Sequence, residues 1–367
     1  MNKSPNLSTF DAEMKCEQVL SDAVNVMVSI SGGADSDVML DLIHRKQKEK
    51  QFPIEIYYVF FNTGIEMQAT LDHLDYLEKK YNIKIERAMA NVPVPFGCLR
   101  YGQPFLSKYV SSMISKLQSK NFDFAKDGNK SYEELSEKYK KCQNALKWWC
   151  DKHPQKAEYK SMFNINNTKW LKEYMIANPP DFKISNLCCN GAKKNTAHKW
   201  EEEHNCDTKC VGLRKAEGGI RRVAVKTCFT NRGGQKVYRP IFWFSDKDRR
   251  EYEEFFNIKH SRCYTDYGFK RTGCSGCPYG SDWEEELEIL KTFEPLLYKA
   301  ANNVFGKSYE YTRGYRKFKK EMNAMQEHKL RKNITISGSV WNKAKEDAKK
   351  FDMNFSEYLE YLIMKEA

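Results

Sequence analysis

A run of six residues that begins at Ser31 and reads Ser-Gly-Gly-Ala-Asp-Ser has the composition of an anion-binding loop. Gly32 and Gly33 let backbone N–H groups approach an anion with no Cβ in the way. Ser31 and Ser36 add hydroxyl donors, and the carboxylate of Asp35 could orient a metal-bound phosphate or one under attack. An ordinary turn between a strand and a helix is the alternative interpretation of the Gly-Gly pair by itself.

Four cysteines in two close pairs predict a metal centre. Cys188 and Cys189 are adjacent, and Cys274 and Cys277 flank a C-x2-C turn that begins 85 residues downstream. Four thiolates suit zinc or an iron–sulfur cluster. Adjacent side chains point in different directions, which favours the separate iron corners of a [4Fe–4S] cluster over one tetrahedral Zn2+. Thiols that bind no metal are the third interpretation. The sequence leaves open which four cysteines bind, and the possible substitutes are Cys206, Cys210, Cys228 and Cys263.

Two arginines between the cysteine pairs could bind an oxyanion. The segment Gly-Leu-Arg-Lys-Ala-Glu-Gly-Gly-Ile-Arg contains Arg214 and ends at Arg221. A guanidinium can bind two oxygens of a phosphate or sulfate at once. From the charges alone, an ion-paired surface turn is the safer interpretation. The neighbouring segments favour oxyanion binding over a surface turn. A Pro-Ile-Phe-Trp stretch before Asp246 opens a predicted helix, and Arg271 leads into the second cysteine pair.

Alternating strands and helices are predicted to hold these residues together. Val24–Ile30 is a short apolar run that indicates a strand directly before Ser31, and helical spacing follows at Asp37–His44. The next strand, helix and strand are predicted at 54–60, 67–80 and 83–87. Such alternation indicates a parallel sheet with right-handed crossovers, whose ligands bind at the carboxyl ends of the strands. The turn Asn62–Glu66 occupies that end of the second strand.

Length and charge limit the class of protein. The 367 residues are enough for two or three domains, and the net charge is +12. That charge favours an acidic partner such as a nucleotide or nucleic acid, with solvated surface lysines as the alternative. No segment approaches the ~20 apolar residues of a membrane span, and the first residues lack the apolar core of a signal peptide. We therefore expect a cytoplasmic protein with no membrane partner, in which disulfides are disfavoured.

A lysine-rich segment interrupts the alternating pattern. Residues 100–183 carry 16 Lys or Arg against nine Asp or Glu, so +7 of the net charge lies here. The helical spacing of Tyr132, Leu135 and Tyr139 indicates a core, whereas basic residues interleaved with aromatics can also hold single-stranded nucleic acid. The sequence leaves both interpretations open for the aromatic residues Phe105, Tyr109, Tyr132, Tyr139, Trp148, Trp149, Tyr159 and Trp170.

The end of the chain, residues 331–367, is predicted to form a separate unit. Asn333–Ser337 alternates polar and apolar residues as a strand does. Ser339 could cap a first helix, and Asn354 and Glu357 stand at capping-box spacing before a second helix. One strand and two short helices cannot bury an apolar face without a partner.

This strand-helix-helix unit resembles a ribbon-helix-helix module, in which strands of two chains pair and enter the major groove of DNA. The resemblance implies a homodimer in which Thr335 and Ser337 read bases. A helical tail that packs on its own domain is the alternative.

Five motifs follow the order found in the phosphoadenosine phosphosulfate reductase family. They are S-G-G-x-D-S, C-C, G-x-R-x-x-E-x-x-x-R, P-I-x-W with a following Asp, and R-T-G-C-x-G-C-P. The first resembles the pyrophosphate (PP) loop of ATP pyrophosphatases, and the cysteine pattern resembles that of iron–sulfur adenylylsulfate reductases. The resemblance covers residues 20–285 and implies an α/β fold with a Rossmann-like, doubly wound parallel sheet. It implies a nucleotide-binding domain made of residues 1–99 and 186–330. A helical insertion is implied at 100–185, and the terminal module at 331–367.

The resemblance also implies roles for single residues. Those assigned to catalysis are Asp35, Ser36, Arg214 and Arg221. The ligands of a [4Fe–4S] cluster, with Zn2+ as the alternative, are Cys188, Cys189, Cys274 and Cys277. An adenine nucleotide, ATP or a relative with Mg2+, is expected to bind to Ser31, Gly32, Gly33, Asp35, Ser36, Asn62, Thr63, Gly64, Glu66, Arg214, Glu217 and Arg271, the last closing over its anionic end.

Two departures from the family bear on the reaction. Ala34 replaces the Lys often found in the PP loop, which removes one charge from the phosphate cradle. The reductases use a C-terminal Cys as nucleophile on sulfur, whereas this sequence has no Cys after Cys277. We therefore expect an enzyme that cleaves ATP to AMP and pyrophosphate and activates a substrate for sulfur transfer, as in the DNA-phosphorothioation branch of the family.

Nucleic acid is the expected acceptor, DNA before tRNA, and a cysteine desulfurase or another sulfur donor is an expected partner. Two other classes stay open. One is a sulfonucleotide reductase in sulfate assimilation with an unusual thiol, such as Cys98 or Cys263, and the other is a DNA-binding regulator that senses nucleotide or redox state.

Overall fold

The computed structural model of the chain describes residues 4–154, 161–217, 225–327, 337–351 and 353–366. By their internal contacts, these residues form two compact units, 1–318 and 319–367. The first unit contains a six-stranded sheet with the order β3-β2-β1-β4-β6-β5. Its strands are β1 (Asn25–Ile30), β2 (Glu55–Asn62), β3 (Ile85–Met89), β4 (Thr208–Val211), β5 (Phe229–Arg232) and β6 (Gln235–Tyr238).

The strand directions agree with a Rossmann-like α/β fold. The pairs β2–β3, β1–β2, β1–β4 and β4–β6 are parallel, as the alternation of strands and helices predicts. The edge pair β5–β6 is an antiparallel hairpin, so the sheet is mostly rather than wholly parallel. This hairpin is a correction to the predicted all-parallel sheet, and its tight turn contains Gly233 and Gly234, both with positive φ.

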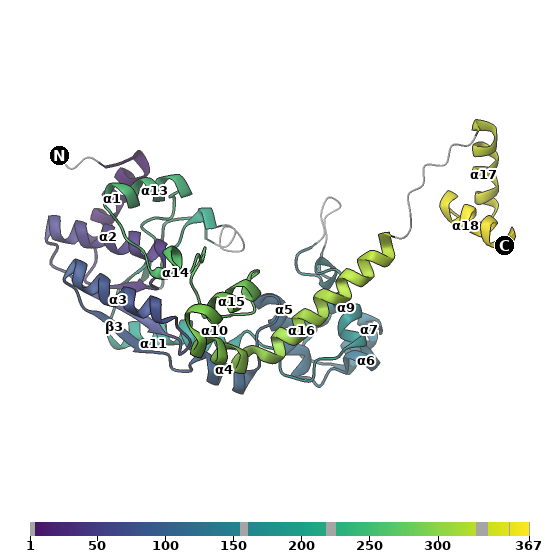
Figure 1. The fold of residues 1–367 in the computed structure, drawn as a ribbon, viewed down its shortest axis with the longest axis horizontal. Helices are drawn as coiled ribbons and strands as arrows, with labels where there is room; N and C mark the ends of the chain where they lie inside the picture. Colours follow the sequence, from purple (N-terminus) through teal and green to yellow (C-terminus); the bar gives the residue numbers. More distant parts are fainter. Residues whose placement is uncertain (1–3, 155–160, 218–224, 328–336, 352, 367) are drawn as a thin grey trace. The chain divides into compact units, whose positions relative to one another are not determined.

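Helices cover both faces of the sheet. Val26, Val28 and Ile30 of β1 belong to an apolar cluster with residues of α1, α2 and α3, whereas Met27 faces the other way and packs with Trp200. The alternation follows from the period of two along a strand. The first face is covered by α1 (Leu7–Ser21), α2 (Ala34–Lys50), α3 (Gln68–Tyr81) and α13 (Asp246–Phe255), and the second by α11 (Asn195–Glu203) (Figure 1).

The carboxyl ends of β1 and β4 meet at the centre of the sheet. The two strands pair in register from Val26 with Thr208 to Ser29 with Val211. The chain leaves β1 toward β2 on one side, whereas β4 continues to β6 on the other side. A reversal of this kind is the place where open α/β sheets bind ligands. It lies between the loop that begins at Ser31 and the turn that follows β4.

The segment predicted as an insertion folds into short helices around aromatic side chains. Phe105, Tyr139, Trp148 and Trp149 are buried in one cluster, so these four form core and are not available for stacking on bases. Tyr315 joins the same cluster. Tyr109, Tyr132 and Trp170 are partly exposed, and Tyr159 lies outside the described residues. The helices are α5 (Lys108–Gln118), α6 (Phe124–Asp127), α7 (Tyr132–Lys138), α8 (Gln143–Trp149), η1 (Ile165–Asn167) and α9 (Leu171–Ala177).

A third apolar cluster surrounds the paired cysteines. It includes Cys98, Cys188, Cys263, Trp283 and Phe305. The elements that supply or border it are α4 (Val94–Tyr101), α10 (Leu187–Cys189), η2 (Asn190–Lys194), η3 (Lys215–Glu217), α14 (Arg262–Thr265), α15 (Trp283–Phe293) and α16 (Pro295–Glu327). Helices of this region are marked in Figure 1.

The second unit contains α17 (Gly338–Lys350) and α18 (Phe355–Glu366). Asn354 and Glu357 form the predicted reciprocal cap, with the Glu357 N–H donating to Oδ1 of Asn354 at 3.0 Å and the Asn354 N–H to Oε2 of Glu357 at 2.8 Å. The first helix is capped at Ser337 rather than at the predicted Ser339. The predicted strand lies outside the described residues except for Ser337. In the described part of the chain, every helix is too short or too polar to cross a membrane.

Candidate active site

The loop between β1 and α2 forms a cradle that only glycine allows. Gly32 has a φ of +66°, and a Cβ there would lie 2.7 Å from Cγ2 of Thr70. Gly33 is the N-cap of α2 and makes no side-chain cap hydrogen bond, and the N–H of Ala34 in the first turn donates to Oη of Tyr264. Two glycines and a helix N-terminus favour an anion at this position, because the positive end of the helix dipole lies there.

Hydroxyl groups of the loop bond to one another. Ser36 is buried, and its Oγ donates to the carbonyl oxygen of Gly33 at 2.8 Å and accepts from Oγ of Ser31 at 3.1 Å. Oγ of Ser31 also accepts from the N–H of Gly33 at 3.3 Å. The proton of the Ser36 hydroxyl is therefore directed at the loop backbone, and in this structure Ser36 shapes the loop.

The loop borders a pocket of about 470 Å3 at the carboxyl ends of β1 and β4, which we call the loop pocket. Gly212, just after β4, is pressed against the loop, since a Cβ there would lie 2.9 Å from the carbonyl oxygen of Asp35. Among the described residues, five cations and three carboxylates line the loop pocket, namely Lys193, Arg214, Arg249, Lys270 and Arg271 with Asp35, Glu217 and Asp246. The excess of positive charge suits a polyanionic ligand.

Asp35 is held by two arginines in the loop pocket. Arg214 donates from Nε to Oδ1 of Asp35 at 2.7 Å, and Arg249 donates from Nη1 to the same oxygen at 3.1 Å. Arg214 also donates from Nη1 to Oδ1 of Asp246 at 2.9 Å. Burial lowers the pKa of Arg214, but the charges of Asp35 and Asp246 outweigh burial and raise it. The structure brings the predicted residues Asp35 and Arg214 together, whereas Arg221 lies outside the described residues.

Glu217 and Arg271 border the same pocket from two other segments. Oε1 of Glu217 accepts from the backbone N–H of Arg214 at 3.2 Å, and its Oε2 lies 3.6 Å from Nη2 of Arg271. The Arg271 side chain is 72% exposed, against 6% for Arg214. Arg271 is therefore placed where a ligand can reach it without displacing a buried ion pair.

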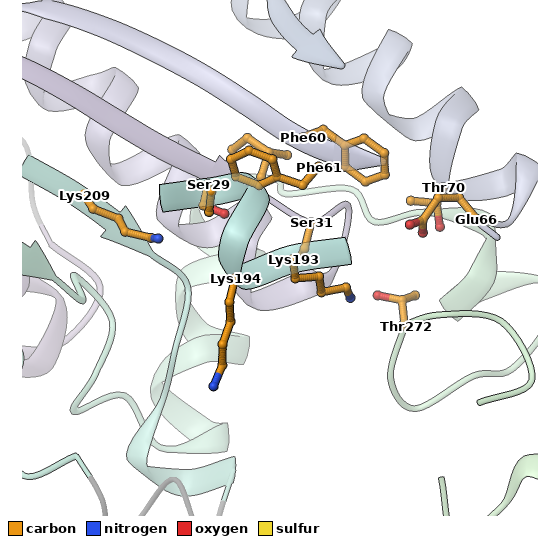
Figure 2. Close-up of a pocket in the computed structure, with 13 residues that line it drawn as sticks. Ser29, Ser31, Phe60, Phe61, Glu66, Thr70, Lys193, Lys194, Lys209 and Thr272 are labelled. Carbon is orange, nitrogen blue, oxygen red and sulfur yellow. The ribbon is translucent and has the colours of Figure 1, made fainter. Parts of the chain in front are cut away.

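A second, smaller pocket of about 250 Å3 shares four of these lining residues and adjoins the first (Figure 2). Phe60 and Phe61, at the end of β2, supply apolar surface, and Lys193 extends toward Thr272 (Figure 2). The residues common to both pockets are Ser29, Ser31, Lys193 and Thr272. The two pockets together suit a ligand that joins an apolar ring to an anionic group.

The turn after β2 reaches the smaller pocket through Glu66. Thr63 is buried and donates its N–H and its hydroxyl to Oε1 of Glu66 at 3.0 and 2.6 Å. The N–H of Gly64 donates to Oδ1 of Asn62 at 2.8 Å. Glu66 lines the smaller pocket, whereas Asn62, Thr63 and Gly64 line neither pocket and shape the turn.

The four predicted metal ligands come from two segments. Cys188 and Cys189 lie on α10, where a Cβ added to Gly97 would come within 3.1 Å of Cα of Cys188. Cys274 and Cys277 flank a turn in which the Cys277 N–H donates to the Cys274 carbonyl oxygen at 3.2 Å. Burial raises the pKa of the Cys277 thiol to about 12, and the charges of Cys274 and Cys189 add to that shift.

The surroundings of these thiols bear on whether they hold a metal. In the residues that the structure describes, no three His, Cys, Asp or Glu side chains are arranged as a metal site. Cys98 is a further thiol beside Cys188. The hydrogen bond with Cys189 lowers the pKa of Cys188, but the hydrogen bond with Cys98 and burial outweigh it and raise that pKa. Ser275, inside the C-x2-C turn, is fully buried, and its Oγ has no hydrogen-bond partner in the described structure.

The cysteines considered as substitute ligands have other neighbours. Cys210 lies in the main core of the sheet, and Cys206 packs on the cluster of its second face. Cys263 donates from Sγ to Sδ of Met67 at 3.5 Å. Cys228 precedes β5, where its carbonyl oxygen accepts from the backbone N–H of Arg239 at 2.7 Å.

A comparison with protein families finds one match that includes the loop. Residues 25–98 match the phosphoadenosine phosphosulfate reductase domain. The matched stretch runs from β1 into α4, and the arginine and paired-cysteine motifs lie beyond it. The comparison with curated proteins gives no match.

A comparison with solved structures finds matches in several kinds of protein. A phosphoadenylyl-sulfate reductase from Candida auris in a phosphate complex has 13% identity and a TM-score of 0.38, over 72% of this chain and 87% of that one. A tRNA thiolase from Methanococcus maripaludis with its [4Fe–4S] cluster has 14% identity and a TM-score of 0.35, over 85% and 79%. An NH3-dependent NAD synthetase from Campylobacter jejuni has 12% identity and a TM-score of 0.32, over 83% and 96%.

Sequence reasoning missed three residues of the loop pocket. Arg249 lies in a helix of mostly charged residues, so its sequence context is that of a solvated side chain. Lys193 follows the cysteine pair by a few positions, and that proximity was a usable signal. Tyr264 resembles an ordinary core aromatic, yet its Oη accepts from the backbone N–H of Ala34 at 3.2 Å and lies 3.2 Å from Oγ1 of Thr272.

Proposed function

We propose that this chain is an ATP pyrophosphatase of the phosphoadenosine phosphosulfate reductase type, which cleaves ATP to AMP and pyrophosphate and thereby activates an acceptor for sulfur transfer. The observation that carries the proposal is the cationic loop pocket, with Asp35 and Arg214 paired at the N-terminus of α2 and an apolar pocket adjoining it. The family match at residues 25–98 supports it, because the loop lies within the match.

In this proposal the phosphates bind at the Ser31 loop, and the adenine occupies the smaller pocket beside Phe60 and Phe61. An acceptor oxygen attacks the α-phosphorus, the bond to the bridging oxygen of the β-phosphate breaks, and pyrophosphate leaves with additional negative charge. AMP stays bonded to the acceptor oxygen until the sulfur nucleophile displaces it. Guanidinium groups and N–H donors that are already in place stabilise this charge more in the transition state than in the ground state. Arg214 and Arg271 are the proposed cations for that role.

Mg2+ is the proposed metal partner of the nucleotide. It prefers oxygen ligands and is commonly held by one or two carboxylates together with phosphates. Asp35 offers a carboxylate in the loop pocket, so the donor chemistry fits. Bound there, the ion would neutralise charge on the phosphates.

A [4Fe–4S] cluster on Cys188, Cys189, Cys274 and Cys277 is the second proposed cofactor, with Zn2+ as the alternative. The donor set fits, because four thiols from two segments act on one another's pKa values. Ser275 adds a buried hydroxyl without a partner, and a cluster sulfur would accept its hydrogen bond. Such a cluster would supply a site for sulfur or electrons next to the turn that contains Thr63, which accepts from Sγ of Cys274 at 3.7 Å.

We propose DNA as the acceptor, ahead of tRNA, and a cysteine desulfurase or another sulfur donor as the source of sulfur. The net charge of +12 supports a polyanionic partner. Phe105, Tyr139, Trp148 and Trp149 are core, so they do not stack on bases, and the surface lysines of residues 100–185 are the proposed contribution of that segment to such binding.

We propose that residues 331–367 join two copies of the chain and contact DNA. In the described part of this unit, α17 and α18 bury Ala348 and Tyr358. Large apolar side chains stay exposed on the same two helices, namely Val340, Trp341, Phe351 and Leu362. Two short helices with exposed apolar side chains need a partner surface, and a second copy supplies an identical one with two-fold symmetry.

The experiment is an anaerobic preparation with iron and sulfide analysis, followed by an assay of ATP-dependent pyrophosphate release with and without DNA. With sulfide present as the sulfur donor, we expect release of AMP and pyrophosphate in equal amounts, and a faster rate with DNA. Absence of ATP binding would refute the proposal. Release of sulfite from a sulfonucleotide would identify a reductase instead, and DNA binding without any turnover would identify a regulator.

A further inference from the structure

Arg249, on α13, reaches the same carboxylate as Arg214 although it comes from a different element. Its Nη1 lies 3.1 Å from Oδ1 of Asp35, and its side chain lines the loop pocket. Its Nε lies 3.1 Å from Oε1 of Glu253, one turn later on the same helix. In the described structure neither of these last two atoms makes a hydrogen bond, so this second contact is an ion pair only. The Arg249 side chain is 26% exposed, which leaves it accessible from the pocket.

A series of charged groups connects Glu253, the second partner of Arg249, to α2. Oε1 of Glu253 lies 3.1 Å from Nε2 of His260, and Nδ1 of His260 lies 2.8 Å from Oδ2 of Asp37. Asp37 is fully buried in the first turn of α2, and its Oδ2 also lies 2.9 Å from Nε2 of His73. Arg249 is therefore tied to the helix that carries the loop both through Asp35 and through Glu253.

The loop itself contributes no cation. The position inside the Ser-Gly-Gly-Ala-Asp-Ser run that would carry a charge is Ala34, a buried residue that lines the loop pocket. The carboxylate of Asp35 presents an anionic oxygen to two guanidinium groups. A phosphate oxygen could take the place of that carboxylate oxygen, because both are anionic acceptors for a guanidinium. A phosphate that enters the loop pocket meets Arg249 already oriented, because its Nη1 donates to Asp35 and its guanidinium lies within ion-pair distance of Glu253.

We propose that Arg249 is a phosphate-binding residue of the loop pocket, and that Asp35 holds its guanidinium in place until the phosphates of the nucleotide replace that carboxylate as its partner. This inference rests on the proposed function, because it assumes the same ligand class at the same pocket. It assigns a role to a residue outside the matched family segment.

The test is calorimetric titration of the full chain with inorganic pyrophosphate and, separately, with ATP. Arg249→Ala should weaken both ligands about tenfold, which corresponds to about 1.4 kcal/mol. Arg249→Lys should recover part of the loss, because it keeps the charge but not the fork. Arg250→Ala is the matched control, since it removes the same charge from the next, exposed residue and should leave both affinities unchanged.

Three results decide the inference. If the wild-type chain binds neither pyrophosphate nor ATP, the proposed function fails and this inference fails with it. If the wild type binds both and Arg249→Ala binds them equally well, the inference alone is overturned. It is also overturned if Arg249→Lys is as weak as Arg249→Ala and both variants unfold at a lower temperature than the wild type, since Arg249 would then act only as a structural link.

Discussion

Asp35 and Arg214 are joined across 179 positions of the sequence by a hydrogen bond of 2.7 Å between Nε and Oδ1. Asp35 lies in the first turn of α2, and Arg214 follows β4, so the contact closes the edge of the sheet where the two strands end. The side chain of Arg214 is 6% exposed. Removal of Asp35 therefore leaves the buried charge of Arg214 with Asp246, which is 67% exposed, as its remaining counterion at that site.

We expect Asp35→Ala to abolish ATP-dependent pyrophosphate release. Arg214→Ala should lower the rate by roughly 10²-fold or more, because charge that develops on the leaving phosphate loses a preorganised donor. Release is measured by a coupled pyrophosphate assay, with circular dichroism to show that the fold is kept. Asp181→Ala is the control, as that side chain is 81% exposed and forms a surface pair with Lys307. Unchanged turnover in Asp35→Ala would contradict the proposed site.

Replacement of Gly32 by Ala should damage the loop more than its backbone strain alone explains. The new Cβ would lie 2.7 Å from Cγ2 of Thr70 in addition to a φ of +66°. Gly233→Ala is the matched control, because its φ is +62° and nothing lies within 4 Å of the new Cβ. We expect Gly233→Ala to lower the free energy of unfolding by about 1 kcal/mol, and Gly32→Ala to lower it further and abolish ATP binding. Chemical unfolding and calorimetry measure the two effects, and equal losses in both variants would remove the steric argument.

Cys274→Ser and Cys277→Ser should each remove the brown chromophore expected of an anaerobic preparation. They should also lower the midpoint of thermal unfolding, because the ligands tie two distant segments together. Cys150→Ser is the control, since Cys150 belongs to the helical cluster of residues 100–185. Absorbance spectra with iron and sulfide analysis provide the measurement. One zinc per chain and no iron would reject the [4Fe–4S] assignment in favour of a structural zinc site.

His260 should make stability depend on alkaline pH. Burial lowers its pKa, but the hydrogen bonds and charges of Asp37 and Glu253 outweigh burial and raise it from 6.5 to about 9. A pKa raised in the folded state gives stability that is complete below pH 6.5 and is lost as the pH rises through about 9. The loss is at most about 3 kcal/mol. The measurement is the difference in unfolding free energy between wild type and His260→Gln at pH 6 to 10. A difference that does not change with pH would exclude this role for His260.

Cysteines of the unfolded chain titrate in the same pH range and also change the unfolding free energy. Their contribution is the same in wild type and His260→Gln, so it cancels in the difference between the two curves. His198→Gln is a second control, because that side chain is 62% exposed. It should follow the wild-type curve.

A chain that ends at residue 330 should be a monomer with weaker DNA affinity and unchanged basal ATP turnover. The apolar side chains left exposed on α17 and α18 are lost with the unit, and with them the proposed contact between copies. Light scattering and DNA titration provide the measurements. In the full chain, Thr335→Ala should relax sequence preference more than total affinity if the strand reads bases while lysines bind phosphates. A monomeric full-length chain, or DNA binding that survives truncation unchanged, would assign this unit to packing only.

Local patterns determined much of the fold. The strand before Ser31, the loop and the helix after it follow from residues that are neighbours in sequence, because a buried strand, a glycine turn and a helix start are each local events. The same holds for the reciprocal cap of Asn354 and Glu357. The positions of β2 and β3 followed from the same alternation, within two residues at either end.

The tertiary structure decided what the charged and aromatic residues do. Arg249 has the sequence context of a solvated helix residue, and only the packing of α13 on α2 brings it to Asp35. Trp148 and Trp149 fit both a core and a nucleic-acid surface in sequence, and their burial follows from helices that fold back on them. The sequence around a residue is the same whether its side chain contacts water or a distant segment of the chain. The topology of the fold therefore decides which of the two it contacts.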